Sequence, residues 1–71
     1  MAGEQDYRRR IGERIRRARE TAGLSQTELA QRLGVADKQI SRWENGVQPR
    51  PGTLERVAAA LGVEVERFFH D

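Results

Sequence analysis

Four of the polar side chains between residues 37 and 42 would lie together on one side of a helix and can exchange hydrogen bonds with the edges of planar partners such as nucleotide bases. They are Asp37, Lys38, Ser41 and Arg42. Ile40 and Trp43 lie three residues apart in the same segment, so a helix here has an apolar side and presents the four polar residues on its other side. Arginine and lysine donate to guanine O6 and N7, whereas a carboxylate accepts from the amine of cytosine. The segment therefore has the groups needed to read base edges in a DNA groove.

Asp37 also has a purely structural interpretation. Ala36 precedes it and has no side-chain acceptor with which to cap a helix. Asp37 can act in its place near the positive start of the helix, either as a cap or as a partner of the helix dipole. Base reading and helix stabilisation both stay open, and the two roles are compatible.

The residues before this segment predict a second helix that would position it. Ser25 and Glu28 have the S-x-x-E spacing of a capping box, in which each side chain satisfies a backbone donor at a helix start. Apolar residues then recur at helical spacing up to Leu33, and Gly34 suits the left-handed conformation that ends helices. Two helices of about eight residues joined by a short glycine turn form a helix-turn-helix unit, here at about residues 25–45.

The residues in and around this unit match a known pattern across nearly the whole chain. The matching residues are Leu24-Ser25-Gln26, Glu28-Leu29-Ala30, Leu33-Gly34-Val35, Ile40-Ser41-Arg42, Glu44-Asn45-Gly46, Pro51, Leu54 and Leu61-Gly62-Val63. The spacing between these matching residues requires no insertion or deletion. From about Ile11 to Phe69 the chain resembles the Cro/phage-repressor (Xre-like) helix-turn-helix family. The resemblance implies an all-α, compact five-helix fold, the lambda-repressor-like DNA-binding domain, acting as a dimer.

The resemblance also implies roles for residues outside the outward face. Gln26 is expected to hold a phosphate at a helix start, where free N–H groups and the helix dipole favour an anion. The other residues expected to contact phosphates or flank the site are Gln39, Asn45, Arg50 and Thr53. Asn45 with Gly46 is also typical of a plain turn, which can coexist with that role. Arg19 and Glu44 are expected to form a structural ion pair between the first helix and the base-reading helix.

Helical periodicity predicts three further helices around this unit. A flexible arm is expected at residues 1–6, a first helix from about Asp6 to Thr21, and a domain over residues 7–71. Gly12 lies inside that helix, where glycine costs up to about 1 kcal/mol relative to alanine. Thr53 is expected to cap a fourth helix, and a short fifth helix is expected from Glu66 to about His70. The expected core consists of Ile11, Ile15, Ala18, Leu24, Leu29, Leu33, Val35, Ile40, Trp43, Leu54, Val57, Leu61, Val63, Val65 and Phe68.

Length and composition limit the classes of function. A chain of 71 residues builds one small core and leaves no second domain to hold a catalytic cleft. It has no cysteine, and its single histidine, His70, lies one residue from the end. No apolar run approaches the about 20 residues that span a bilayer. We therefore expect a cytoplasmic protein that is not an enzyme and has no cofactor, metal site, membrane segment or small-molecule substrate.

Positive charge is concentrated in the first two-thirds of the chain. Residues 7–50 contain eleven Lys and Arg against five Asp and Glu, although the net charge of the whole chain is only +2. Such segregation favours a polyanionic partner. The alternative explanation is an arginine-rich proteome, since arginine outnumbers lysine by twelve to one.

The expected function is that of a small transcriptional regulator that reads double-stranded DNA, most simply a repressor on a palindromic operator. A homodimer is expected to form through Val65, Phe68 and Phe69 near the C-terminus, and the competing interpretation is that both phenylalanines complete the core. The alternative functions are a restriction–modification controller protein and an antitoxin that autoregulates its operon and neutralises a partner toxin.

Overall fold

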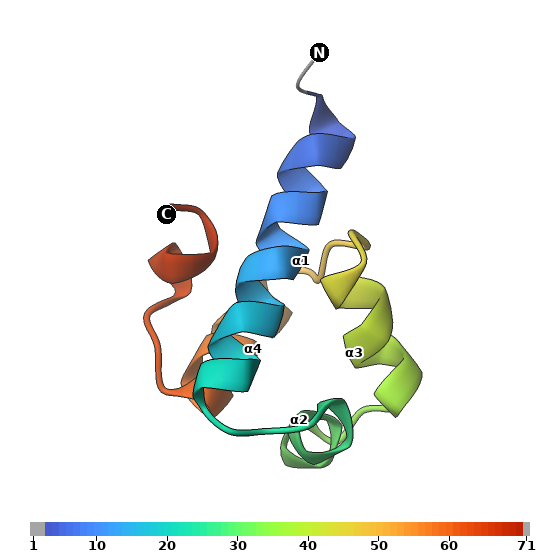
Figure 1. The fold of residues 1–71 in the computed structure, drawn as a ribbon, viewed down its shortest axis with the longest axis vertical. Helices are drawn as coiled ribbons and strands as arrows, with labels where there is room; N and C mark the ends of the chain where they lie inside the picture. The colour runs from blue at the N-terminus through green and yellow to red at the C-terminus, as the bar shows by residue number, and fades with distance from the viewer. Residues whose placement is uncertain (1–2, 71) are drawn as a thin grey trace.

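Four α-helices and one short 3-10 helix make up the fold. The computed structural model describes residues 3–70, apart from the side chains of residues 4 and 5. The elements in chain order are α1 (Glu4–Thr21), α2 (Gln26–Leu33), α3 (Asp37–Glu44), α4 (Pro51–Leu61) and η1 (Val65–Phe68). Figure 1 shows α1 as the long central helix, with α3 on one side, η1 on the other, and α2 across the base. No strand occurs in the described part of the chain, which confirms the all-α prediction.

The expected short fifth helix is present only as a 3-10 helix, Val65–Phe68. Instead of a helix from Glu66 to His70, the chain forms one 3-10 turn, in which Arg67 N–H donates to the carbonyl oxygen of Glu64 at 2.9 Å and Phe69 N–H to that of Glu66 at 3.0 Å. The segment is four residues long, and short helical segments of this length commonly adopt i to i+3 hydrogen bonds. Across residues 3–70 the chain therefore forms four α-helices and one 3-10 helix, so the expected count of five helices is not confirmed.

The first helix starts earlier than expected. Residues 4–6, which were expected in a flexible arm, belong to α1. Tyr7 N–H donates to the carbonyl oxygen of Gly3 at 3.1 Å, which closes the first helical turn. Asp6 lies in that turn, where negative charge complements the helix dipole. Residues 1 and 2 of the expected arm lie outside the described residues.

Helix α4 also begins earlier, because a proline sets its start. The N-cap is Arg50 and Pro51 is the first helical residue, so the prediction that Thr53 caps this helix is wrong. Proline fits the first helical position, since its fixed φ is already helical and its missing N–H would have no partner there. Leu54 N–H then donates to the carbonyl oxygen of Arg50 at 2.9 Å.

Most of the residues that helical periodicity predicted to be in the core are buried in the structure. Trp43 is only 4% exposed, so it packs inside rather than stacking on a base. The other buried apolar residues are Ile11, Ile15, Leu29, Ala30, Leu33, Ile40, Leu54, Val57, Ala58, Leu61 and Phe68. Five expected core residues are only partly buried around its edge: Ala18, Leu24, Val35, Val63 and Val65.

Gly12 allows α1 and α3 to approach each other more closely than any other residue would. A Cβ atom at this position would lie 2.5 Å from the carbonyl oxygen of Trp43 and 2.7 Å from that of Glu44. Both are backbone atoms at the end of α3, so neither can rotate away. The lower helix propensity of glycine inside α1 is therefore offset by the close α1–α3 contact, which only glycine permits.

We predict that Gly12→Ala destabilises the protein by about 1–3 kcal/mol, although alanine is the better helix former, because the added methyl group overpacks the α1–α3 contact. Gly52→Ala is the matched control, since a Cβ at Gly52 would meet nothing within 4 Å. That substitution should be neutral or stabilise by about 0.4–1 kcal/mol. Urea unfolding followed by circular dichroism measures both variants. Equal stability of the two variants would contradict the steric role of Gly12.

The start of α2 is held by the predicted capping box. Glu28 N–H donates to Ser25 Oγ at 3.0 Å, and Ser25 N–H donates to Glu28 Oε1 at 2.8 Å. The donated backbone hydrogen bond from Ser25 lowers the pKa of the Glu28 carboxyl below its usual value of 4.5. The carboxylate is therefore more stable in the folded chain than in the unfolded chain.

This pKa difference predicts a pH dependence of stability. Because the unfolded chain binds the Glu28 proton more readily, the stabilisation is fully present above the ordinary pKa of 4.5 and is lost as the pH falls through the lower folded value. Glu28→Gln has no proton to bind at this position. The free energy of unfolding of the native chain relative to Glu28→Gln should therefore decrease between about pH 6 and about pH 3. The same difference at both pH values would argue against this role of Glu28.

Candidate nucleic-acid interface

The turn between α2 and α3 fixes the orientation of α3. Gly34 ends α2 in the left-handed conformation, with a φ of 71°, and its freedom from a Cβ makes that conformation accessible. Val35 N–H donates back to the carbonyl oxygen of Ala30 at 3.0 Å, which closes the turn. Helix α3 then buries Ile40 and Trp43 in the core. These local features form the helix-turn-helix unit that the sequence predicted.

Three of the four predicted base-reading residues are exposed on the side of α3 that faces away from the core. They are Asp37, Lys38 and Arg42, whereas Ser41 is half-buried. The structure therefore brings an acid and two cations together within two turns of one helix. Gln39, predicted at the flank, is also half-buried.

A buried ion pair joins α1 to the end of α3. Arg19 Nε donates to Glu44 Oε2 at 2.6 Å, and Arg19 Nη2 donates to Glu44 Oε1 at 3.1 Å, while each residue is only 8% exposed. The hydrogen bond to Glu44 raises the pKa of Arg19 above its ordinary value. Arg19 Nη1 also donates to the carbonyl oxygen of Leu24 at 2.8 Å, so the guanidinium holds the end of the α1–α2 connection as well. The pairing that the resemblance implied is present in the structure.

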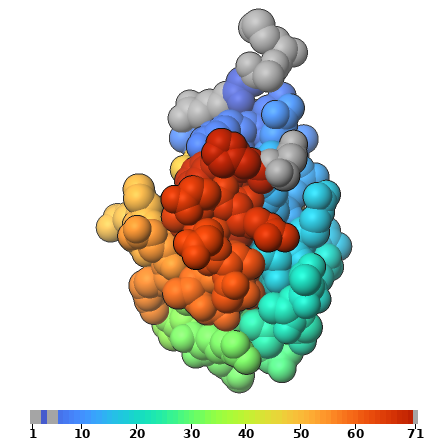
Figure 2. Space-filling view, turned by 90° about the vertical axis from the view of Figure 1, so that its left-hand side faces the viewer, coloured from blue at the N-terminus to red at the C-terminus, as the bar shows by residue number. Residues whose placement is uncertain are grey.

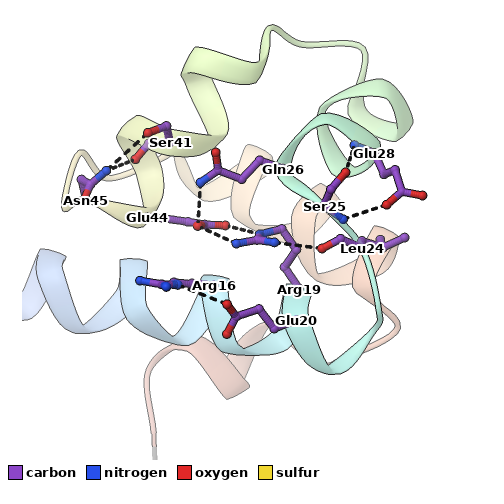
Figure 3. A network of polar contacts seen from close by, with 10 residues as sticks. All are labelled: Arg16, Arg19, Glu20, Leu24, Ser25, Gln26, Glu28, Ser41, Glu44 and Asn45. Atoms are coloured by element: carbon purple, nitrogen blue, oxygen red, sulfur yellow. Dashed lines mark hydrogen bonds and ion pairs between the residues drawn. The ribbon is translucent and has the colours of Figure 1, made fainter.

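The same pair also fixes the side chain of Gln26. Gln26 Nε2 donates to Glu44 Oε1 at 3.0 Å, so Glu44 lies between Arg19 and Gln26 (Figure 3). A side-chain amide has two N–H donors, and this contact uses one of them. The second donor and the backbone N–H at the first position of α2 are groups of the kind that bind anions at helix starts. Sequence reasoning placed Gln26 at a phosphate but did not predict that Glu44 orients it.

Asp37 is held by a residue that the sequence did not single out. Thr27 Oγ1 donates to Asp37 Oδ2 at 2.6 Å, which connects the starts of α2 and α3. The N-cap of α3 is Ala36, and no side chain caps it, so the capping role considered for Asp37 is wrong. Asp37 instead lies in the first turn, where its charge complements the helix dipole. Thr27 and Asp37 lie ten positions apart in the chain, so no local sequence pattern could indicate this contact.

Asn45 serves as part of the turn that ends α3. Asn45 Nδ2 donates to the carbonyl oxygen of Ser41 at 2.8 Å and is 3.4 Å from Ser41 Oγ (Figure 3). Its amide donors are therefore directed back onto α3, as the plain-turn interpretation predicted. Arg50 is exposed at the N-cap of α4, and Thr53 is half-buried in the first turn of that helix.

The residues predicted to form a dimer interface are separated by the fold. Phe68 has no exposed surface and packs in the core of its own chain, so its assignment to the interface is wrong. Phe69 is half-buried, and its ring stacks on that of Tyr7 with 6.3 Å between ring centroids. Tyr7 is 46% exposed. The exposed aromatic surface near the C-terminus is therefore formed by Tyr7 and Phe69, not by Phe68 and Phe69. Val65, the third predicted interface residue, is half-buried.

Neither a metal cluster nor a membrane-spanning helix occurs in the part of the chain that the structure describes. Across residues 3–70, no group of three or more His, Cys, Asp and Glu side chains is placed to hold a metal ion. None of the helices in this range is both long and apolar enough to cross a membrane.

The buried pair yields a prediction about stability. We expect Arg19→Met to destabilise the protein by about 3–5 kcal/mol, because it leaves the Glu44 carboxylate buried without its cation. Arg19→Met combined with Glu44→Leu should be less destabilising than the single substitution, because no charge is then stranded. Arg16→Met is the control: it breaks an ion pair with Glu20 whose side chains are 64% and 55% exposed, and it should cost less than about 1 kcal/mol. Urea unfolding compares the three variants, and equal losses in Arg19→Met and Arg16→Met would contradict the prediction.

Comparison with known proteins supports this description. A family model described as Helix-turn-helix matches residues 15–68. The HTH-type transcriptional regulator SinR of Bacillus subtilis is 42% identical over 63 residues, which are 86% of this chain and 57% of that protein. The chain spans about half the length of the curated relatives it matches.

Solved structures have the same fold. A hypothetical transcription factor, NHTF, from Neisseria has a TM-score of 0.84 at 31% identity, over 99% of this chain and 82% of that one. The master regulator for biofilm formation, SinR, in complex with DNA, has a TM-score of 0.77 at 39% identity, over 84% of this chain and 98% of that one. The helix-turn-helix unit and these matches show that the chain belongs to the Cro/phage-repressor (Xre-like) helix-turn-helix family.

Proposed function

We propose that this chain is a sequence-specific, double-stranded DNA-binding transcriptional regulator, acting as a repressor on a palindromic operator in the cytoplasm. The observation that carries the proposal is the division of α3 into two sides. Ile40 and Trp43 are buried on one side, while Asp37, Lys38 and Arg42 are exposed on the other. A helix that is held rigidly on one side and polar on the other is what a major groove accepts.

Base reading is assigned to the exposed side of α3. Arg42 donates to guanine O6 and N7 through two parallel hydrogen bonds, and Lys38 donates to the same kind of acceptor. Asp37 accepts from a cytosine amine or orients the start of α3 through its bond with Thr27, and Ser41 supplies a smaller polar contact. These four residues lie within two turns of helix, so one copy of the domain reads a short half-site.

Phosphate contacts are assigned to residues that surround α3. Gln26 is the strongest candidate, because its side chain is anchored on Glu44 and its backbone N–H lies at the start of α2. Arg50 and Thr53 lie at the start of α4, where free N–H groups also favour an anion. Gln39 and Asn45 complete the proposed flank, with Asn45 acting mainly through the turn that it stabilises.

The relatives support this proposal. SinR, a transcriptional regulator, has been solved in complex with DNA, and its DNA-bound chain resembles this chain over nearly its full length. The positive charge of residues 7–50 suits the same kind of partner.

We further propose that the domain acts as a homodimer. One α3 contacts too few bases for high specificity, and twofold dimers of helix-turn-helix domains place two such helices about 34 Å apart on palindromic DNA. Because Phe68 is buried, the proposed contact uses the exposed part of the Tyr7–Phe69 stack together with Val65.

Selection of bound DNA from a random duplex library, at about 150 mM salt so that charge alone does not dominate, tests these proposals. We expect an enriched palindrome. Arg42→Ala should relax the preference at one base position in each half-site, because the loss of a bidentate guanine contact removes about 1–3 kcal/mol of discrimination.

Arg17→Ala is the matched control for this selection. It removes the same charge from α1, at a residue whose neighbouring pocket is lined by residues of α4 and η1 and by none of α3, and should leave the selected motif unchanged. Enrichment of single half-sites would contradict the dimer but not the base-reading role of α3. Loss of all enrichment in the native chain would contradict sequence-specific binding itself.

A further inference from the structure

A groove of about 510 Å³ lies on the side of α1 that faces away from α3. It is lined by the C-terminal half of α1, the end of α4 with the residues that follow it, and η1 with His70. Figure 2 shows η1 in red between α4 in orange and α1 in blue to cyan. Figure 1 shows that α3 lies on the opposite side of α1. The groove is therefore separate from the surface proposed to contact DNA.

The lining of the groove combines cations with apolar surface. Arg14 and Arg17 come from α1, Arg67 comes from η1, and the apolar part is formed by Ala18, Leu61 and Val63. None of the described lining residues is acidic. Cationic groups thus line the groove from two different elements, and apolar side chains form another part of its lining.

Two of the three arginines of this groove, Arg17 and Arg67, differ from the arginines that have partners within the protein. Arg16 pairs with Glu20, Arg19 pairs with Glu44, and Arg56 donates to the carbonyl oxygen of Leu33 at 2.7 Å. Within residues 3–70, the guanidinium groups of Arg17 and Arg67 form no hydrogen bond or ion pair. Two donors with five N–H groups each are therefore available to a ligand.

Arg14 gives the groove a fixed donor. Its Nη1 donates to the carbonyl oxygen of Phe68 at 3.1 Å, which ties α1 to the end of η1. Because Phe68 is wholly buried, this carbonyl is held in place by the core. A cation that is positioned before binding loses less conformational entropy when an anion arrives.

The lining decides which class of anion fits. A guanidinium fork matches a carboxylate through two parallel hydrogen bonds, while apolar side chains gain from contact with a hydrocarbon chain and not with a sugar–phosphate backbone. The volume lies in the range of small-molecule sites, which is about 300–1,000 Å³. A ligand with one carboxylate near Arg17, a second near Arg67 and a short apolar chain joining them would pair with both cations and contact the apolar part of the lining.

We propose that this groove binds a small organic anion, a dicarboxylate with a short apolar chain, between Arg17 of α1 and Arg67 of η1. The site goes beyond the proposed function and does not depend on it. The sequence did not indicate a small-molecule ligand, because residues 14–18 and residues 61–67 meet only in the folded chain.

Titration of the ¹⁵N-labelled protein with straight-chain dicarboxylates tests the site directly. The probes are succinate, adipate and suberate, with inorganic phosphate at matched ionic strength. We expect at least one dicarboxylate to shift the backbone amide signals of Ala18, Thr21, Gly62 and Val63 in a saturable way, while the signals of α3 stay unchanged. Phosphate should bind at least about tenfold more weakly, because it makes no apolar contact.

Two variants make the test specific. Arg17→Gln with Arg67→Gln should weaken dicarboxylate binding at least about tenfold, because both charged anchors are lost. Arg16→Gln removes a charge from the same helix outside the groove and should leave the affinity within about twofold. The amide spectra also show that each variant is folded.

Four outcomes would overturn the proposal. They are no saturable shift with any of the three dicarboxylates, shifts centred on α3 instead of the groove, equal binding of phosphate, and equal weakening by Arg16→Gln. Shifts of the groove signals by short random DNA duplexes but not by the dicarboxylates would assign the groove to nucleic acid instead.

Discussion

The contact between α1 and the end of α3 is the constraint on which the rest of the structure depends. It combines a buried ion pair, Arg19–Glu44, with a point of backbone approach at Gly12. Burying two charges costs free energy, and the pair compensates because its members form two hydrogen bonds with each other and further ones with Leu24 and Gln26. Such a pair contributes little net stability, but it fixes the position of α3, because any displacement of the helix would leave buried charges without partners.

Two further contacts transmit this constraint to the proposed interface. Glu44 holds the side chain of Gln26 at the start of α2, and Thr27 in the next position holds Asp37 at the start of α3. The start of α2 is itself closed by the capping box of Ser25 and Glu28. Gln26 and Asp37 are therefore positioned by hydrogen bonds within the protein before any ligand arrives, and this reduces the conformational entropy that they lose on binding.

The arginines of α1 serve different purposes on different sides of the same helix. Toward α3, Arg19 is buried and structural. Away from α3, Arg14 and Arg17 line a groove whose third cation comes from η1. Arg19 lies in an ion pair, and Arg14 and Arg17 lie at the groove on another side of α1, so positive charges that would repel one another on a single side are kept apart. The excess of positive charge in residues 7–50 therefore does not mark one surface only.

The sequence by itself determined the parts of this protein that depend on neighbours along the chain. The capping box, the left-handed Gly34 and the alternation of Ile40 and Trp43 with polar residues are local patterns, so they predicted α2, α3 and the side of α3 that faces outward. The Arg19–Glu44 pair was implied only by family resemblance, because twenty-five residues separate its members. Tertiary structure alone decided that Gly12 is required by the backbone of α3, that Phe68 is wholly buried, that Thr27 holds Asp37, and that α1 and η1 enclose a cationic groove. Each of these depends on where helices pack against one another, and periodicity within one helix carries no information about that.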